Sequence, residues 1–232
     1  MLTGKEFVSK IKQDNQALFD ASCINVKAYF DSKPTKEELV THFIGRMVNE
    51  RMNMIEISNT IASLPAETTA EEFELLTKQA HDEAVHFRLV KNVIEHITGE
   101  SLDVDAAIAA EKSKPTAKGA ALLEKYEAEK DPLALAAYQL VAEGRAEAVW
   151  DQMAECIEDE FISRSYARIA RDEGFHSNIG AIKLETLATT PEAQARVELL
   201  VNNLRKDLFE ISCMNTTEVP AARALVTEAY SW

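Results

Sequence analysis

The chain has 232 residues, of which 46% are apolar and 28% are charged, so it can bury a sizeable core and is not disordered. Its 25 basic and 39 acidic residues give a formal net charge of −14, which disfavours binding to nucleic acid or to an anionic membrane surface. No apolar run is long enough for a membrane span, and no apolar leader segment opens the chain. The three cysteines are too sparse for a disulfide framework, so we expect a cytoplasmic protein.

Helical periodicity dominates the first hundred residues, and we find no strand-like alternation there. Three helices are expected: over 3–31, from Pro34 to Ser63, and from Thr68 or Thr69 to Gly99. The second of these starts with Thr35 and Glu38 at the spacing of a capping box. These features indicate an all-α fold.

The rest of the chain opens with a less regular stretch, 100–131, in which we expect one short helix around 120–129. Asp131 and Pro132 then have the pattern of an N-cap followed by a first-turn proline. Four further helices are expected: 131–158, 159–188, 191–213 and a short one after Pro220.

The four central helices form two successive pairs joined by the long connection at 100–131. A pair, a crossover and a second pair is the connectivity of ferritin-like four-helix bundles. We therefore expect one ferritin-like domain over 1–232, with a core bundle at about 35–188 and flanking helices at 3–31 and 191–229.

Carboxylates interrupt the apolar stripes of the central helices. Glu50 lies between Met47 and Met54 on one helical face, and Glu83 lies between Ala80 and Phe87 on another. Burying a lone carboxylate is costly unless something pairs with it. The alternative for Glu50 is a position at the edge of the helix, from which its side chain reaches solvent.

Two of these carboxylates belong to Glu-x-x-His sequences, which place a carboxylate and an imidazole one turn apart on one helical face. They are Glu83 with His86 and Glu173 with His176. Each follows a helix with a candidate acid, and Glu83 follows Glu50 by 33 residues while Glu173 follows Glu143 by 30. The two halves of the chain thus repeat the same order of ligand types.

This repeated order predicts a site for two metal ions at the centre of the bundle. The expected ligands, which would also be the catalytic residues, are Glu50, Glu83, His86, Glu143, Glu173 and His176. Mixed carboxylate and imidazole ligation suits two iron ions, with manganese or a mixed manganese–iron pair as alternatives. Glu147 is a weaker candidate for the fourth carboxylate.

Both Glu-x-x-His sequences are preceded by an aspartate, Asp82 in one and Asp172 in the other. Metal-bound histidine usually donates its other N–H group to a carboxylate or a carbonyl. In an antiparallel bundle, Asp82 would reach His176 and Asp172 would reach His86. The alternative is two solvent-exposed acids beside the site.

The sequences DEAVH and DEGFH resemble those of the ferritin-like di-iron carboxylate superfamily, and the chain is distantly similar to cyanobacterial aldehyde-deformylating oxygenase over about residues 35–188. The resemblance implies Glu143 rather than Glu147 as the fourth carboxylate. It also implies a di-iron oxygenase or oxidase that activates O₂ and oxidises a small apolar or amphipathic organic substrate. An external electron donor would be needed, since the chain has no flavin or nicotinamide motif.

The sequence leaves two other functions open. One is a ferroxidase, iron-handling or peroxide-reducing protein without an organic substrate, and the other is a helical interaction module without a metal. The flanking helices favour the oxygenase, because they could enclose a substrate pocket. Tyr166 lies two turns before Glu173, where a redox role and a core position are both open. The sequence allows a homodimer and leaves the substrate undetermined.

Overall fold

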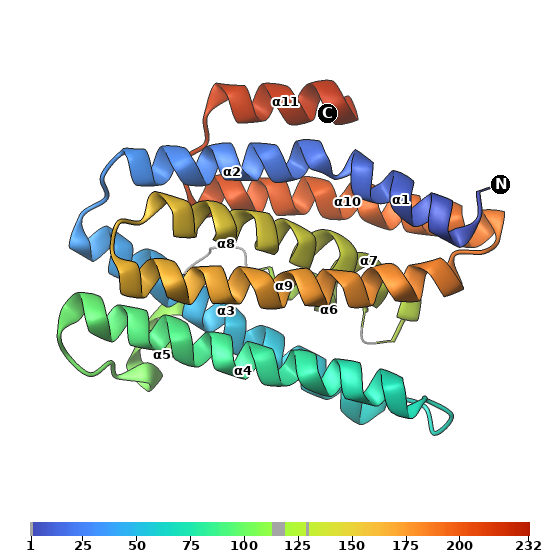
Figure 1. Cartoon of the computed structure of the whole chain (residues 1–232), viewed down its shortest axis with the longest axis horizontal. Coiled ribbons are helices and arrows are strands. Elements are labelled where there is room, and N and C mark those ends of the chain that lie inside the picture. Colours follow the sequence, from blue (N-terminus) through green and yellow to red (C-terminus); the bar gives the residue numbers. More distant parts are fainter. Residues whose placement is uncertain (1, 113–118, 129) are drawn as a thin grey trace.

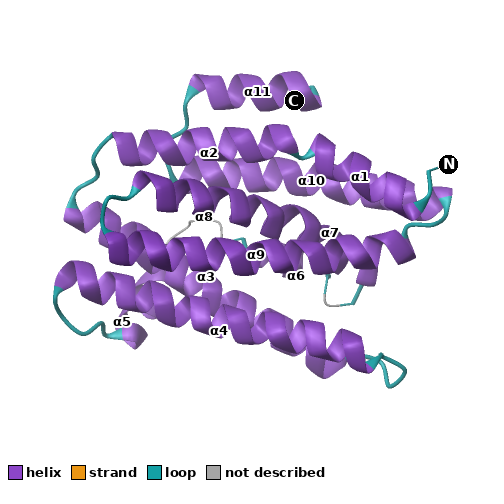
Figure 2. Ribbon diagram, in the orientation of Figure 1, coloured by secondary structure: helices purple, strands orange, loops and turns teal. Residues whose placement is uncertain are grey.

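The computed structural model describes residues 2–112, 119–128 and 130–232, and every regular element in these ranges is helical. Figures 1 and 2 show the helices lying roughly parallel to one long axis. The expected all-α class is confirmed. Across the same ranges, no helix combines the length and the apolar character that crossing a membrane requires.

The described elements follow one another in this order: α1 Gly4–Asp14, α2 Gln16–Asp31, α3 Lys36–Ser63, α4 Ala70–Thr98, α5 Val104–Lys112, α6 Ala121–Lys125, α7 Pro132–Tyr138, the π-helical segment η1 Gln139–Glu143, α8 Gly144–Cys156, α9 Glu160–Leu187, α10 Pro191–Asn215 and α11 Pro220–Tyr230. Helix α3 pairs with α4, and the run α7–η1–α8 pairs with α9. Helix α4 also contacts α9, which joins the two pairs, while α2 packs on α8 and α11 covers α2 (Figure 1).

The ends of the long helices are set by local capping, as the sequence predicts. Thr35 and Glu38 form the expected capping box at the start of α3. Thr69, one of the two candidates, caps α4 by accepting from the Glu72 amide. Gly99 ends α4 in the left-handed conformation, with φ of 78°.

The prediction of a single helix over 3–31 is wrong, because the helix is interrupted at Asn15, between α1 and α2. The hydroxyl of Tyr230, from α11, lies at this break. It donates to the Asp14 carbonyl at 2.7 Å and accepts from the Leu18 amide at 3.1 Å. These two backbone groups would otherwise bond to each other in a continuous helix. A distant side chain therefore interrupts the helix.

The helix expected over 131–158 is confirmed as an unbroken helical run from Pro132 to Cys156, but it contains the π-helical segment η1 between α7 and α8. Ser177 of α9 donates to the Leu140 carbonyl at 3.1 Å, which gives that oxygen a partner outside its own helix. Gly180 allows α9 to approach closely at the same level, near Ala136 and Leu140. Short π segments occur often at functional sites, and η1 ends at Glu143.

We expect Gly180→Ala to lower the free energy of unfolding by about 1–3 kcal/mol. A methyl group there would lie 2.5 Å from the Ala136 carbonyl oxygen of α7 and 2.6 Å from the Leu140 amide nitrogen of η1, so α9 would have to move away from both. Urea unfolding measures the change. Asn178→Ala, on the exposed side of the same helix, is the control and should change stability by less than about 0.5 kcal/mol. Equal stabilities for the two variants would contradict this close approach.

The connection at 100–131 holds one helix that the sequence analysis missed, α5, and one that it expected, α6. Helix α6 is shorter than the predicted 120–129, and Glu129 lies outside the described residues, as does 113–118.

The helices outside 35–188 are part of the core. Phe7 and Ile11 of α1, Leu18 of α2, and Leu204 and Phe209 of α10 are at most 1% exposed. All five belong to one apolar cluster that also includes α7 and η1. These flanking helices are therefore built into the fold that positions the site.

Candidate metal centre

The structure brings all six predicted ligands together between α3, α4, η1 and α9. Two overlapping groups of four residues each place one ligand atom per residue within 4.8 Å of the others. The groups are Glu50, Glu83, His86 and Glu173, and Glu83, Glu143, Glu173 and His176. Each group has one histidine and one carboxylate of its own, and both share Glu83 and Glu173. Each group could therefore hold a metal ion, and Glu83 and Glu173 are available to both.

The ligand side chains point into the interior from the apolar helical faces that the sequence predicts to be buried. Phe43, Met47 and Ile57 are buried on the Glu50 face of α3, and Leu76 and Val90 are buried on α4. None of the six ligands is more than 3% exposed. Burial of four carboxylates in one place requires compensating positive charge.

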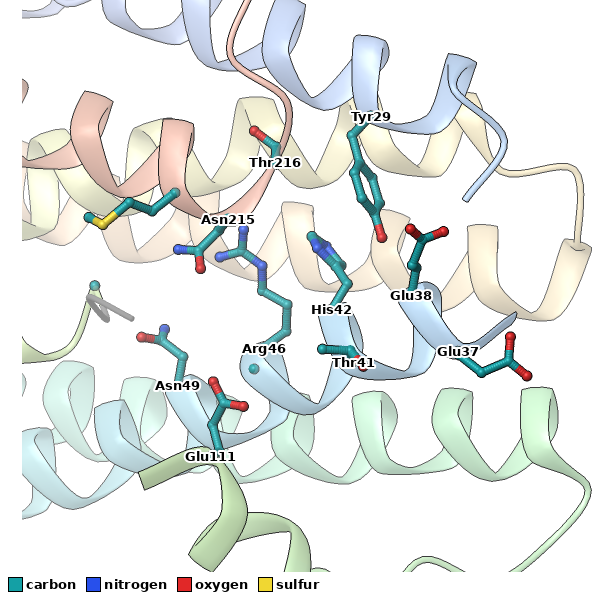
Figure 3. Close-up of a pocket in the computed structure, with 13 residues that line it drawn as sticks. Tyr29, Glu37, Glu38, Thr41, His42, Arg46, Asn49, Glu111, Asn215 and Thr216 are labelled. Atoms are coloured by element: carbon teal, nitrogen blue, oxygen red, sulfur yellow. The ribbon is translucent and has the colours of Figure 1, made fainter. Parts of the chain in front are cut away.

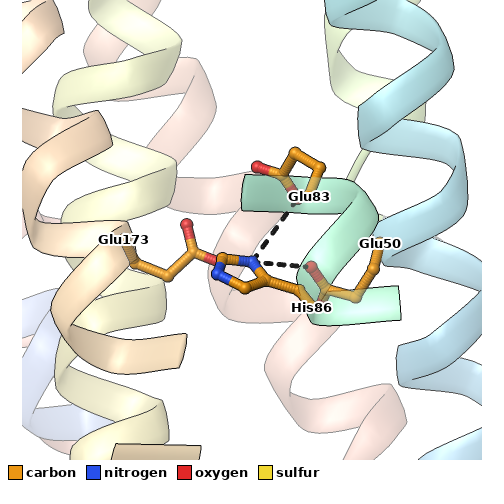
Figure 4. Close-up of side chains that lie close together, drawn as sticks. All are labelled: Glu50, Glu83, His86 and Glu173. Atoms are coloured by element: carbon orange, nitrogen blue, oxygen red, sulfur yellow. Dashed lines mark ion pairs between the residues drawn. The ribbon is translucent and has the colours of Figure 1, made fainter. Parts of the chain in front are cut away.

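Both histidines direct their Nδ1 atom into the cluster of carboxylates. Nδ1 of His86 lies 3.6 Å from Glu50, 3.8 Å from Glu83 and 3.5 Å from Glu173 (Figure 4). Nδ1 of His176 lies 3.4 Å from Glu83 and 3.2 Å from Glu173. Each Nδ1 is therefore the nitrogen available to a metal.

The other ring nitrogen of each histidine, Nε2, contacts the aspartate that the sequence predicts as its partner. Nε2 of His86 lies 3.3 Å from Asp172, and Nε2 of His176 lies 3.2 Å from Asp82. Each Nε2–H donates to its aspartate, which leaves the Nδ1 lone pair directed at the cluster. Lys78 in turn pairs with Asp82.

We expect Asp172→Asn to weaken metal binding by roughly 10- to 100-fold, because the amide no longer fixes the His86 tautomer. Electron paramagnetic resonance of free Mn²⁺ in a titration of the protein measures the affinity. Asp151→Asn, at an exposed position of α8, is the control. Equal affinities in the two variants would show that the Asp172 contact has no influence on the site.

The pKa values show what balances the buried carboxylates when no metal is bound. Burial raises the pKa of Glu50 to about 8 and that of Glu143 well above its usual range. Burial opposes the protonation of His86 and His176, but bonds to Asp172 and Asp82 and to the inner carboxylates raise both pKa values well above normal. Burial raises the pKa of Glu83, but the two histidines beside it lower that pKa below its usual range. Protons thus occupy positions that divalent cations would take.

Several ligand atoms have no hydrogen-bond partner in the described part of the chain. They include Oε2 of Glu50, Oε1 of Glu83 and Nδ1 of His86. Cations between these atoms would complete their coordination. The cluster offers carboxylate oxygens and imidazole nitrogens and no thiolate, a donor set that iron and manganese accept. The residues present therefore fit a pair of divalent metal ions.

Three amides around the carboxylates were not predicted. Asn53 lies 3.4 Å from Glu83 and donates to it, and Gln79 donates to Glu143 at 3.3 Å. Gln139 donates to Gln79 at 2.8 Å. Asn53 and Gln79 lie three or four residues from a ligand on the same helix, so the helical period could have identified them.

The secondary candidates lie outside both ligand groups. Glu147 is exposed, and its carboxylate lies against Gly174, where a Cβ atom would come within 2.5 Å of it. Tyr166 is buried beside Phe43 and Trp150, with ring centroids 5.5 Å and 5.7 Å away. The geometry therefore favours Glu143 over Glu147 as the fourth carboxylate.

No protein-family model matches the sequence, and no curated protein matches it. The fold, by contrast, is similar to that of a solved all-helical protein. A TenA homolog from Pseudomonas syringae pv. tomato superposes with a TM-score of 0.65 over 90% of this chain and 92% of its own, at 11% sequence identity. At this identity the similarity concerns the fold alone.

This match overturns the resemblance to the ferritin-like di-iron superfamily, including aldehyde-deformylating oxygenase. The similarity to the TenA homolog spans nearly the whole chain, whereas the ferritin-like resemblance covered only 35–188. Six ligands and two Asp-Glu-x-x-His sequences constrain one face of each central helix. They carry no information about α1, α2, α10 and α11, which pack on the central helices and on one another.

Proposed function

We propose that the protein is an O₂-dependent non-haem dimetal oxidoreductase that oxidises a small organic substrate. Iron is the metal we propose first, with manganese or a mixed pair as the alternatives. The observation that carries the proposal is the pair of overlapping ligand groups that share Glu83 and Glu173. When bound, two redox-active ions supply electrons and open coordination positions for dioxygen.

The residues around the site have separable tasks in this proposal. Glu50 with His86, and Glu143 with His176, would each hold one metal, and Glu83 and Glu173, which belong to both groups, would help to hold each of them. Asp82 and Asp172 orient the imidazoles and keep the proton on Nε2. Burial of all six ligands excludes bulk water, which strengthens their electrostatic interactions.

Anaerobic loading with Fe²⁺ followed by exposure to O₂ tests the proposal. We expect oxygen uptake and new optical absorption from the iron-loaded protein, and repeated turnover when a chemical reductant replaces the external electron donor. Glu143→Gln should abolish both signals, whereas Glu147→Gln, one turn away and exposed, should retain them. Oxygen uptake at the rate of free Fe²⁺ would contradict the proposal. Mineral accumulation without reductant-driven turnover would indicate iron handling instead.

A further inference from the structure

A pocket of about 530 Å³ lies between the first half of α3 and the end of α10 with the segment that follows it. Tyr29, Arg46, Asn49, Asn215 and Thr216 are among the residues that line it. Figure 3 shows Arg46 extending from α3 towards Asn215. The ligand Glu50 follows Asn49 directly in α3 and lies one turn after Arg46, so this helix carries both pocket-lining residues and a ligand of the metal centre.

Arg46 is the buried cation of this pocket. Arg46 is 9% exposed, and its guanidinium carbon lies over the Trp150 ring, 4.5 Å from the ring centroid. That contact covers one face of the guanidinium and leaves its N–H edges for hydrogen bonds. Within the described residues, no carboxylate or other acceptor receives a hydrogen bond from it. A buried guanidinium without an acceptor is costly, so its position calls for an anionic partner.

Other groups near Arg46 also lack an acceptor. Trp150 Nε1 and the Tyr166 hydroxyl are buried without a hydrogen-bond partner in the described ranges. Arg145 is a second buried cation, and it donates to the Ser22 hydroxyl at 3.0 Å. Burial and the neighbouring Arg46 charge lower the pKa of Arg145 to about 10. Arg46 and Arg145 are thus two neighbouring buried cations, and neither forms an ion pair with a carboxylate in the described part of the chain.

Glu50 is the nearest alternative source of compensation for Arg46, since it lies one turn further along α3. Its charge acts on Arg46, but no ion pair joins the two residues. Glu50 is instead directed at His86, 3.6 Å away. The Arg46 guanidinium is therefore available to a ligand in the pocket.

The pocket also limits the kind of anion. Glu37, Glu38 and Glu111 line it as well, and their carboxylates would repel a multiply charged ligand such as a phosphate. A single carboxylate makes two parallel hydrogen bonds with a guanidinium edge. The volume is within the range of sites for small organic molecules.

We propose that this pocket binds a small organic monocarboxylate through Arg46. Resting on the proposed function, the inference extends to the reaction: this carboxylate is the substrate of the metal centre. Arg46 then acts as a specificity-determining residue, which selects substrates that carry one negative charge.

Calorimetric titration of the metal-free protein with hexanoate, hexan-1-ol and hexylamine tests the binding site without involving the metals. We expect hexanoate to bind and the alcohol and amine to bind at least about tenfold more weakly. Hexanoate should also raise the melting temperature of the wild-type protein, a readout that needs no variant. Equal binding of hexylamine and hexanoate would overturn the proposal.

Arg46→Met should weaken hexanoate binding by roughly ten- to hundredfold, and Arg46→Lys should retain part of it. Arg51→Met, on the same helix and outside the pocket, should bind hexanoate like the wild type. Should Arg46→Met fail to fold, Arg46→Lys and the wild-type melting shift still decide the matter. Wild-type hexanoate affinity in a folded Arg46→Met protein would overturn the proposal.

Metal content separates this inference from the proposed function. Arg46→Met should bind the same amount of Mn²⁺ as the wild type, and loss of metal in that variant would overturn the carboxylate site in favour of a charge-balancing role at the cluster. If wild-type protein binds hexanoate through Arg46 but the iron-loaded form shows no oxygen uptake, the carboxylate site stands and the proposed oxidation fails.

Discussion

Replacing Glu83 with glutamine is expected to abolish binding of both metal ions. Glu83 belongs to both ligand groups, is fully buried and contacts both histidines. An amide removes the negative charge and leaves at most one weak oxygen donor for two cations. Metal content after loading with Mn²⁺ and gel filtration, measured by mass spectrometry, should fall from two per chain to near zero.

Two companion variants make this result specific. Glu50→Gln removes a ligand that belongs to one group only, so it should weaken one metal position and spare the other. Glu147→Gln, at an exposed position outside both groups, should retain both metals. If Glu83→Gln lost no more metal than Glu50→Gln, Glu83 would not lie between two positions, and the two-metal geometry would be wrong.

Glu50→Gln is expected to stabilise the metal-free protein at high pH. The pKa of Glu50 is raised from about 4.5 to about 8 by burial and by neighbouring carboxylates. The folded state therefore binds a proton that the unfolded state has already lost, and stability falls as the pH rises from about 4.5 to 8. Glutamine resembles the protonated form and avoids this loss.

The stability difference between the variant and the wild type should grow by on the order of 2–3 kcal/mol between pH 6 and pH 9, and remain constant above that. Urea unfolding in the presence of a chelator measures it at each pH. Glu147→Gln serves as the exposed control. A Glu50→Gln protein that is less stable than the wild type at pH 9 would show that the Glu50 charge is compensated without metal.

The ligand positions could be predicted from the sequence because a helix has one period. A carboxylate between two apolar positions of one helical face is expected to be buried, so Glu50 and Glu83 indicated a shared interior site. The Asp82 and Asp172 contacts followed from the same rotation of about 100° per residue. Capping at Thr35 is a local property, and it too was predictable.

The irregular elements could not be predicted, since their causes are distant in sequence. The break at Asn15 depends on Tyr230, and the π segment before Glu143 depends on Ser177 and Gly180. The fold class beyond all-α depends on how α1, α2, α10 and α11 pack, about which the ligand pattern says nothing. Arg46 was missed because its significance lies in the absence of a partner among the described residues.

Crystallography of the Mn²⁺-loaded protein, with anomalous scattering measured to locate the metal, tests the central claim most directly. We predict two anomalous peaks per chain, about 3.5–4 Å apart. One peak should contact Nδ1 of His86 and the other Nδ1 of His176, with Glu83 and Glu173 between them. A fully loaded crystal with no peak in this cluster, or with its only peaks on the acidic surface, would contradict the assignment of a dimetal centre.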